Sequence, residues 1–212
     1  QTLLANPTCR LLTLVGPGGI GKTRLALAAA ATRTSCYTHA GYFIFFVGMQ
    51  PAQPEDSVNL VVSAIGNALG YTFDAQQTPL TILLNYLSNK NLLLICDNFE
   101  QLKPAATLLN EIVLATPGVQ IVVTSRERLG VRHEWLYEVE GLAFAAAASS
   151  PEGISPSAAL FINCARRVHV DFDTAAEVVY INQICQILEG WPLSIELAAQ
   201  WLRLLTCAAI AE

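Results

Sequence analysis

The sequence feature that most constrains the fold is a glycine-rich segment, Gly16-Pro17-Gly18-Gly19-Ile20-Gly21-Lys22-Thr23. It follows an apolar run at 10–15 and precedes an Ala- and Leu-rich stretch at 22–34 that favours a helix. Glycines let the backbone turn several N–H groups toward one point, and a helix that begins there adds the positive end of its dipole. The segment therefore predicts a strand, a loop and a helix arranged to bind a phosphate group.

The segment also fits the pattern G-x-x-x-x-G-K-[ST], in which the last two residues have separate chemical tasks. Lys22 is expected to reach the β- and γ-phosphates of ATP, and the Thr23 hydroxyl to ligate Mg²⁺. A glycine-rich turn without a ligand is the alternative, but the predicted strand before the loop and the helix after it favour nucleotide. The predicted nucleotide contacts are Gly16, Pro17, Gly18, Gly19, Ile20, Gly21, Lys22, Thr23 and Arg24.

Apolar runs and helical segments alternate along the chain up to Gly141, which indicates an α/β fold with a parallel sheet. The continuous apolar runs at 91–96 and 119–124 are typical of strands that are covered on both faces. Glutamates interleave with the last run, so we expect that strand at an edge of the sheet. Strands are predicted at 10–15, 41–47, 91–96, 119–124 and 135–139, and helices at 22–34, 57–69, 78–87 and 104–115.

The alternation stops after Gly141. The segment 144–156 is rich in Ala, Ser, Gly and Pro and is predicted to be a linker. Only helices are predicted beyond it, at 157–168, 174–188 and 192–205. We therefore expect a nucleotide-binding domain at 1–143, a linker at 144–156 and a helical subdomain at 157–212, truncated relative to a longer protein.

An acid is needed near a phosphate loop to hold Mg²⁺ through its water shell, and Asp97 is the candidate. It directly follows the apolar run 91–96, and such sheets bind ligands at the carboxyl ends of their strands. The alternative is that Asp97 only caps the next helix. Asn98 stands where many hydrolysing P-loop enzymes have a second acid, and Glu100 is nearby, so we expect slow hydrolysis or none.

Arg126 ends the run 119–124 and its Thr-Ser extension, so it should reach the same edge of the sheet as Asp97. A guanidinium forks onto phosphate oxygens, which suits contact with a γ-phosphate. The alternative is a surface ion pair with Glu127 or Glu134. The neighbouring Arg128 and Arg132 are expected to be solvated.

Composition excludes several other classes of protein. Hydrophobic residues make up 53% and charged residues 14%, so the chain is not disordered, yet no apolar run reaches the ~18 residues of a membrane span. A net charge of −5 argues against direct contact with nucleic acid. The six cysteines show no CxxC spacing and do not cluster with histidines, which favours free buried thiols in a cytoplasmic protein over disulfides or zinc.

Four segments in this order resemble the signal-transduction ATPases with numerous domains (STAND), especially the NB-ARC-like ATPase module of large bacterial transcriptional regulators. They are TLVGPGGIGKTRLAL, LLLICDNFEQL, IVVTSRERLG and CQILEGWPLSIELAA. The resemblance implies a sheet order of 5-1-4-3-2, a Walker B role for Asp97 and γ-phosphate sensing by Arg126. It also implies that Pro192 touches the adenine, although Gly190 to Leu193 alone would indicate only a helix stop and a helix start.

The same resemblance implies a nucleotide-dependent switch that is closed with ADP and loosened by ATP for self-assembly. The implied partners are nucleotide with Mg²⁺ and other domains of a larger protein, an effector and a repeat sensor. The chain lacks the Gly-Arg-Glu motif that often precedes the first strand in this family, and Trp191 stands where a smaller apolar residue is usual. The alternatives are a small-molecule kinase, disfavoured because 141–156 holds no arginine for a lid, and an oligomeric motor ATPase.

Overall fold

The computed structural model describes residues 2–39, 41–47, 49, 51–53, 56–71, 78–145 and 154–212. The chain forms two compact units. The first comprises Gln1–Gly16 and Lys22–Val139, and the second comprises Pro17–Gly21 and Glu140–Glu212. The glycine-rich segment is therefore shared, because its middle belongs with the C-terminal helices while Gly16, Lys22 and Thr23 belong with the sheet.

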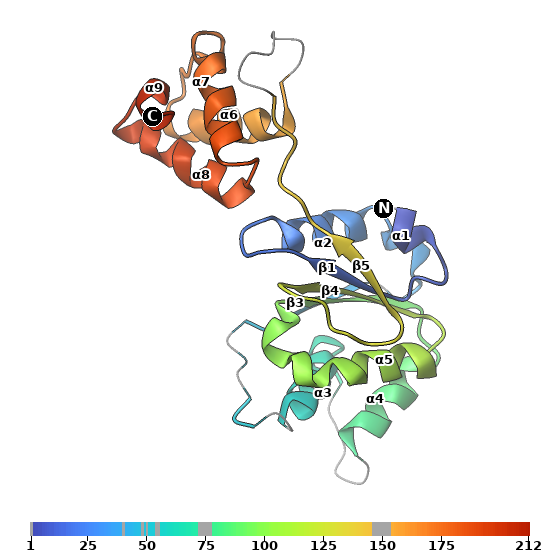
Figure 1. Cartoon of the computed structure of the whole chain (residues 1–212). Helices are drawn as coiled ribbons and strands as arrows, with labels where there is room; N and C mark the ends of the chain where they lie inside the picture. Colours follow the sequence, from blue (N-terminus) through green and yellow to red (C-terminus); the bar gives the residue numbers. More distant parts are fainter. Residues whose placement is uncertain are drawn as a thin grey trace. The chain divides into compact units, whose positions relative to one another are not determined.

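The first unit is built on a five-stranded parallel sheet, shown in Figure 1. The strands follow the order β2-β3-β4-β1-β5, which confirms the predicted order 5-1-4-3-2 as seen from the opposite edge. Each neighbouring pair is parallel, and Val15 of β1 lies beside Ser125 of β4. The bounds are β1 Leu11–Val15, β2 Gly41–Phe45, β3 Leu92–Asp97, β4 Val119–Ser125 and β5 Glu134–Glu138.

The position of each strand follows from its side chains. Every residue of β3 is buried, as expected for a central strand that helices cover on both faces. In β5 the side chains are largely exposed and include the two glutamates at its ends, so the prediction of an edge strand is confirmed. The carboxyl ends of β1, β3 and β4 meet at one edge of the sheet, where Val15, Asp97 and Ser125 end their strands.

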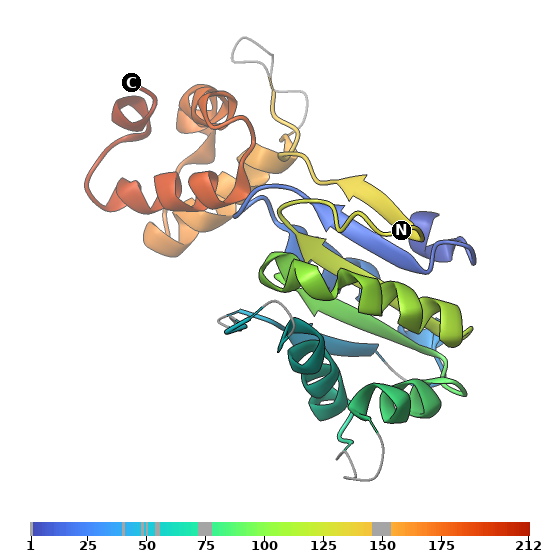
Figure 2. The same cartoon turned by 60° about the horizontal axis from the view of Figure 1, so that its bottom comes forward.

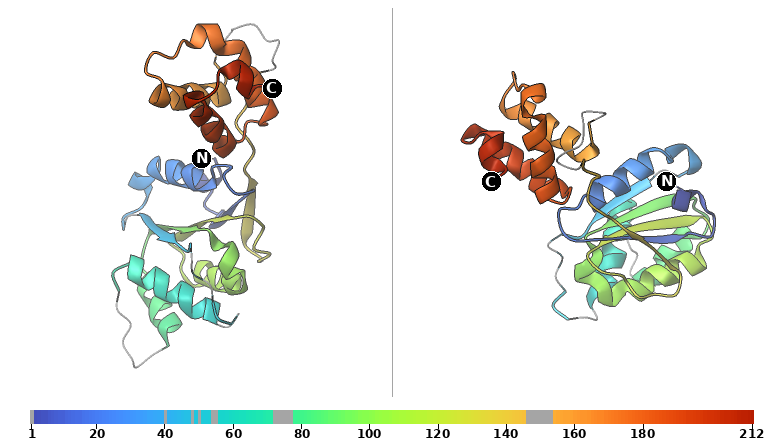
Figure 3. Two further views of the ribbon diagram at one scale, coloured as in Figure 1. Left: turned by 90° about the vertical axis from the view of Figure 1, so that its left-hand side faces the viewer. Right: turned by 45° about the horizontal axis from the view of Figure 1, so that its top comes forward.

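Helices cover the sheet on both faces, as Figure 3 shows. The helix α2 (Lys22–Ala31) lies on one face with α1 (Thr2–Ala5), and Ala26 packs there against Leu12, Leu93 and Val122. The opposite face is covered by α3 (Asp56–Ala68), α4 (Pro79–Leu87) and α5 (Ala106–Ala115), and Figure 2 shows α5 lying along it. Short 3₁₀ turns at Thr34–Cys36 (η1) and Phe99–Ala105 (η2) connect these elements.

The regular elements described in the second unit are helices, and the unit also holds the loop Pro17–Gly21. It contains α6 (Pro156–Val168), α7 (Thr174–Ile187), α8 (Pro192–Gln200), the 3₁₀ turn η3 (Trp201–Arg203) and α9 (Cys207–Ile210). Phe161, Ile181 and Ile195, one from each long helix, are fully buried in its core. Proline at the first position of α6 and α8 starts both helices, since that position donates no intrahelical hydrogen bond.

Several predicted boundaries were wrong. The last helix ends at Gln200 rather than 205, and a 3₁₀ turn and α9 follow it. The helix predicted at 22–34 ends at Ala31, and the helix predicted from 104 is an α-helix only from Ala106. The sequence did not predict α1. The predicted linker 144–156 lies mostly outside the described residues, which omit 146–153, and the predicted domain boundaries stay a prediction.

The structure also describes the features on which the sequence argued about disulfides, zinc and membrane spans. All six cysteines are free thiols, five of them buried and Cys36 exposed. Within the described residues no group of three or more His, Cys, Asp or Glu side chains is placed to hold a metal ion. No helix in that same part of the chain has the length and apolar character that crossing a membrane requires.

Candidate functional site

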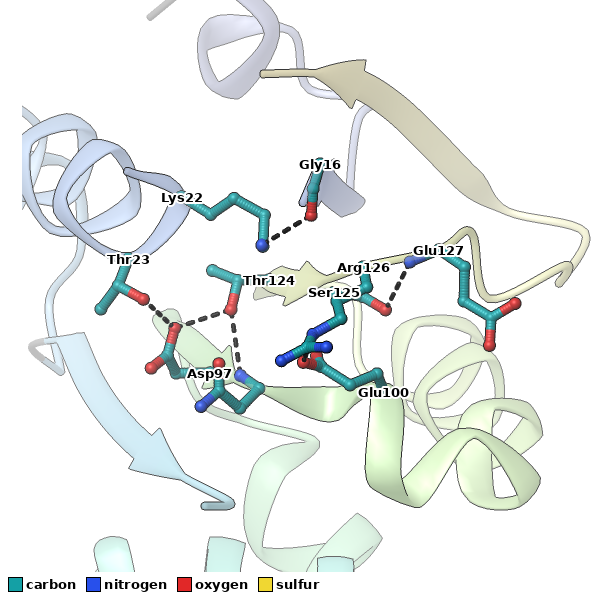
Figure 4. A network of polar contacts seen from close by, with 10 residues as sticks. Gly16, Lys22, Thr23, Asp97, Glu100, Thr124, Ser125, Arg126 and Glu127 are labelled. Carbon is teal, nitrogen blue, oxygen red and sulfur yellow. Dashed lines mark hydrogen bonds and ion pairs between the residues drawn. The ribbon is translucent and has the colours of Figure 1, made fainter. Parts of the chain in front are cut away.

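Lys22 begins α2 after the glycine-rich loop that follows β1, and the residue is buried. Lys22 is 7% exposed, and its Nζ donates to the carbonyl of Gly16 at 2.7 Å (Figure 4). Burial lowers the pKa of Lys22; the charges of Glu100 and Asp97 oppose this and that of Arg126 adds to it. A buried ammonium at a helix N-terminus is stabilised by an anion, which makes this a favourable place for a phosphate.

The loop before Lys22 depends on glycine at two positions. Gly19 and Gly21 have φ values of 77° and 100°, a region that residues with a Cβ rarely adopt. A Cβ on Gly19 would also lie 2.7 Å from two side-chain atoms of Leu193. The backbone conformation and the close approach therefore both require glycine at position 19.

Asp97 lies at the centre of a group of hydroxyls at the end of β3. The residue is 1% exposed, and its Oδ1 accepts hydrogen bonds from Thr23 Oγ1 at 2.7 Å and from Thr124 Oγ1 at 2.6 Å. The structure thus brings together Thr23 and Asp97, which are 74 positions apart in the chain, and their role as a metal site stays a prediction. A hydroxyl and a carboxylate are oxygen ligands of the kind that Mg²⁺ prefers.

Thr124 was missed as a functional candidate. Its hydroxyl donates to Asp97 and accepts from the backbone N–H of Asn98 at 3.0 Å, so it joins the ends of β3 and β4. The sequence did hold a signal for Thr124, since it lies near the end of an apolar strand, two residues before Arg126. A buried hydroxyl at such a place needs a hydrogen-bond partner. Asp97 does not cap the following turn, because Asn98 stands at the cap position of η2 and Asp97 Oδ1 accepts from two hydroxyls.

Asn98 adopts a left-handed backbone conformation, with φ 59° and ψ 45°. Asparagine is among the few residues with a side chain that tolerate this region. It stands just before η2, and its side chain makes no capping hydrogen bond there. The identity of this residue thus has a backbone reason that is separate from any part in hydrolysis.

Arg126 forms an ion pair with Glu100, a partner that the sequence did not predict. Its Nε lies 3.2 Å from Glu100 Oε1. The alternative of a surface ion pair is therefore met with another partner, while Glu127 pairs with Lys103 at 2.7 Å and Glu134 accepts from the backbone N–H groups of Leu129 and Gly130. The other carboxylate oxygen of Glu100 is buried without a hydrogen-bond partner.

In the second unit the start of α8 lies against the loop Pro17–Gly21. The indole Nε1 of Trp191 donates to the carbonyl of Gly18 at 3.2 Å, and the backbone N–H of Leu193 donates to that of Gly19 at 3.2 Å. Pro192 also borders the loop, since its Cγ lies 4.0 Å from where a Cβ on Gly21 would be. The sequence did not predict the contact of Trp191.

Gly190, which precedes this segment, is required by packing inside the same unit. It has a φ of 68°, and a Cβ there would lie 1.9 Å from the carbonyl oxygen of Leu142. The carbonyl of Gly190 accepts from the N–H of Leu142 at 2.8 Å. Any side chain at this position would therefore clash with the backbone of Leu142.

The remaining predicted residues lie farther out. Arg24 is exposed on α2, one residue after Thr23, and its contact with nucleotide stays a prediction. Arg128 and Arg132 are exposed, as expected for solvated side chains. The roles assigned to Lys22, Thr23, Asp97, Arg126 and Pro192 also stay predictions, although the described geometry brings the first four to one edge of the sheet.

Two proteins of Mycobacterium tuberculosis (strain ATCC 25618 / H37Rv) are similar in sequence. An uncharacterized protein is 31% identical over 192 residues, which are 90% of this chain and 45% of the relative. A candidate HTH-type transcriptional regulator is 30% identical over 205 residues, which are 96% of this chain and 21% of the relative. The chain thus spans less than half the length of either relative.

Two solved structures share the fold. A Walker-type ATPase of Pyrococcus abyssi superposes with a TM-score of 0.56 at 16% identity, covering 99% of this chain and 67% of that one. A STAND protein with a tetratricopeptide repeat sensor from Pyrococcus horikoshii gives a TM-score of 0.53 at 16% identity, covering 92% of this chain and 28% of that one. These likenesses support the P-loop ATPase fold.

The model of the AAA domain family matches residues 5–129. The matched region contains the whole glycine-rich segment, Asp97, Glu100, Thr124 and Arg126. Because it covers more than half of the 212 residues, the chain belongs to the AAA domain family and is a P-loop ATPase module.

Proposed function

We propose that this module is an ATP- and ADP-binding molecular switch within a larger signalling or transcription-regulatory ATPase of the STAND type. The observation that supports it most is the joint placement of a buried Lys22 and of Thr23 bound to Asp97. Such a site favours a bound polyphosphate with Mg²⁺. The proposal keeps the two predicted domains, a nucleotide-binding domain at 1–143 and a helical subdomain at 157–212, and assigns the switch to both of them.

Each residue has a defined part in this proposal. Backbone N–H groups of Gly16 to Thr23, except at Pro17, which has none, surround the phosphates. Arg24 lies at the outer end of the loop, and Lys22 neutralises the β- and γ-phosphates. Thr23 and Asp97 hold Mg²⁺, which when bound neutralises charge on the phosphate oxygens. Arg126 contacts the γ-phosphate, and Pro192 touches the adenine.

Slow hydrolysis is part of the proposal. Asn98 can hold a water but cannot accept its proton, and its left-handed backbone gives that residue a structural reason to be there. Arg126 is paired with Glu100, so its guanidinium must leave or share that carboxylate to stabilise charge on a γ-phosphate. A site with these two features retains nucleotide better than it turns it over.

The larger context rests on the relatives. One similar protein is named as a candidate HTH-type transcriptional regulator, and one similar structure is of a STAND protein with a repeat sensor. We infer that the output and the sensing lie in other domains of a longer protein, with self-assembly favoured in the ATP state. A small-molecule kinase and a motor ATPase remain the alternatives, and both require faster turnover than we expect.

Thermal melting with and without Mg-ADP tests the proposal. Ligand at ~100 times its Kd should add about 2.7 kcal/mol to the free energy of unfolding. That corresponds to a rise of roughly 5–10 °C in Tm for a domain of this size. Lys22→Ala should remove most of the shift, and Lys90→Ala is the matched control because Lys90 precedes β3 at the end opposite to Asp97.

No shift in the unmodified chain at millimolar Mg-ADP would contradict nucleotide binding. A shift that survives in Lys22→Ala would place the nucleotide elsewhere. A steady-state phosphate-release assay then separates the alternatives, because fast turnover without partners favours a kinase or a motor. Retention of the nucleotide with little release of phosphate supports the switch.

A further inference from the structure

The start of α8 fixes two consecutive peptide groups of the phosphate loop, all within the second unit. Trp191 Nε1 donates to the Gly18 carbonyl, and the Leu193 N–H donates to the Gly19 carbonyl, both at 3.2 Å. The side chain of Leu193 closes over the Cα of Gly19, where a Cβ would lie 2.7 Å from it. The two carbonyls therefore face α8 and are held there.

Fixing these carbonyls also fixes the N–H groups of the following residues. A trans peptide is planar, so its C=O and N–H point in opposite directions. With the carbonyls of Gly18 and Gly19 turned toward α8, the N–H groups of Gly19 and Ile20 point away from that helix. These amides belong to the middle of the loop, the part of such a motif whose N–H groups converge on an anion.

We propose that Trp191 is a positioning residue that keeps the loop Pro17–Gly21 in its phosphate-binding conformation. The inference rests on the proposed function, because it presumes that the loop binds the phosphates of a nucleotide. Trp191 holds the Gly18 carbonyl through a donor in its side chain, the indole N–H. The Leu193 donor is a backbone N–H that any residue except proline would supply, so the identity of residue 191 decides whether the Gly18 carbonyl is held.

The size of the effect follows from the population of the competent loop. A ligand that binds one conformation loses apparent affinity in proportion to the fraction of molecules in that conformation. A neutral hydrogen bond contributes about 0.5–1.5 kcal/mol net. Its loss therefore corresponds to a decrease in apparent affinity of about 2- to 13-fold. The Leu193 contacts remain in a Trp191 variant, which keeps the expected loss inside this range.

The decisive comparison is Trp191→Phe with Trp201→Phe in the full 212-residue chain. Phenylalanine keeps an aromatic ring but has no N–H. Trp201 lies in η3 of the same unit and is 58% exposed, so the control deletes the same atoms away from the loop. Calorimetric titration gives the Kd of Mg-ADP, and competition against ADP gives the Kd of inorganic pyrophosphate, which has no adenine.

We expect Trp191→Phe to weaken Mg-ADP and pyrophosphate by the same factor, between about 2- and 13-fold. Trp201→Phe should weaken neither ligand. Circular dichroism melts of the ligand-free variants check that both fold as the unmodified chain does. Because pyrophosphate reports on the loop alone, an equal loss for both ligands separates loop positioning from a contact with the base.

Three outcomes would overturn the inference while leaving nucleotide binding in place. Unchanged affinity for ADP in Trp191→Phe would show that the indole N–H does not position the loop. Weaker ADP with unchanged pyrophosphate would move Trp191 to the adenine, and no competition by pyrophosphate in the unmodified chain would mean that the loop is not preformed for phosphate. By contrast, an unmodified chain that does not bind ADP would contradict the proposed function itself.

Discussion

Arg126 Nε lies 3.2 Å from Glu100 Oε1, so the predicted γ-phosphate sensor is held by a carboxylate of the same unit. The arginine side chain is 69% exposed and that of Glu100 only 19%, so solvent reaches the guanidinium much more than the carboxylate. Glu100 and a γ-phosphate would compete for one cation. If Arg126 senses the γ-phosphate as predicted, this competition would give ATP and ADP different effects on it, as the proposed switch requires.

Arg126→Ala should weaken ATP, or a non-hydrolysable analogue, and leave ADP nearly unchanged. A hydrogen bond to a charged group is worth about 1.5–3 kcal/mol, and the exposure of Arg126 puts the expected loss near the lower end, about 10-fold. Paired titrations with the two nucleotides measure it, and Arg128→Ala, also exposed, is the control. Equal weakening of ATP and ADP would mean that Arg126 serves the fold or the shared phosphates.

Glu100→Gln should have the opposite effect and tighten ATP relative to ADP. The substitution keeps the shape of the side chain but removes the charge that competes for Arg126. Partly exposed ion pairs are worth about 0.2–1 kcal/mol, so ATP affinity should rise by up to about 5-fold. Glu127→Gln is the control, because Glu127 pairs with Lys103 instead.

The double variant Glu100→Gln/Arg126→Ala then tests whether the two residues act on each other. If Glu100 acts by holding Arg126, the gain in ATP affinity should vanish once the arginine is gone. A gain that persists would mean that the carboxylate repels the phosphates directly. A loss of ATP affinity in Glu100→Gln alone would contradict the competition.

Asp97→Asn should weaken the dependence of nucleotide affinity on Mg²⁺. The amide oxygen can still accept from Thr23 and Thr124, so the fold should survive, but the charge that attracts the metal is lost. Losing a group that holds a metal through its water shell typically costs about 10- to 100-fold in metal affinity. ADP titrations with Mg²⁺ and with EDTA measure this, and Asp171→Asn, at an exposed position, is the control.

Pro192→Ala should weaken ADP and reduce the preference for adenine over guanine nucleotides. Alanine supports a helix start as well, so the loss would be one of contact with the base. Proline has two ring methylenes that alanine lacks, and losing the contact of one or of both at about 0.8 kcal/mol each corresponds to about 4- to 15-fold. Pro156→Ala, at the first position of α6, is the matched control. If Pro192→Ala binds ADP as tightly as Pro156→Ala and the unmodified chain do, Pro192 only starts the helix.

The sequence by itself determined the features that depend on local pattern. Apolar runs such as 91–96 must be buried strands, and glycines at positions 16, 18, 19 and 21 before Lys22-Thr23 predict a phosphate loop. Helix boundaries were less predictable, because α8 ends at Gln200 without any local stop signal in the sequence. The strand order came from the resemblance to a known family and was confirmed by the observed sheet.

Only the tertiary structure decided which polar groups meet. Thr124 and Asp97 are 27 positions apart, and Trp191 and Gly18 are 173 apart, so no local periodicity relates them. Parallel strands bring Asp97 and Thr124 to one edge, but the choice of Glu100 over Glu127 as the partner of Arg126 depends on where η2 places its side chains. Hydrogen bonds and ion pairs act over about 3 Å, whereas sequence patterns specify only which face or edge a residue occupies.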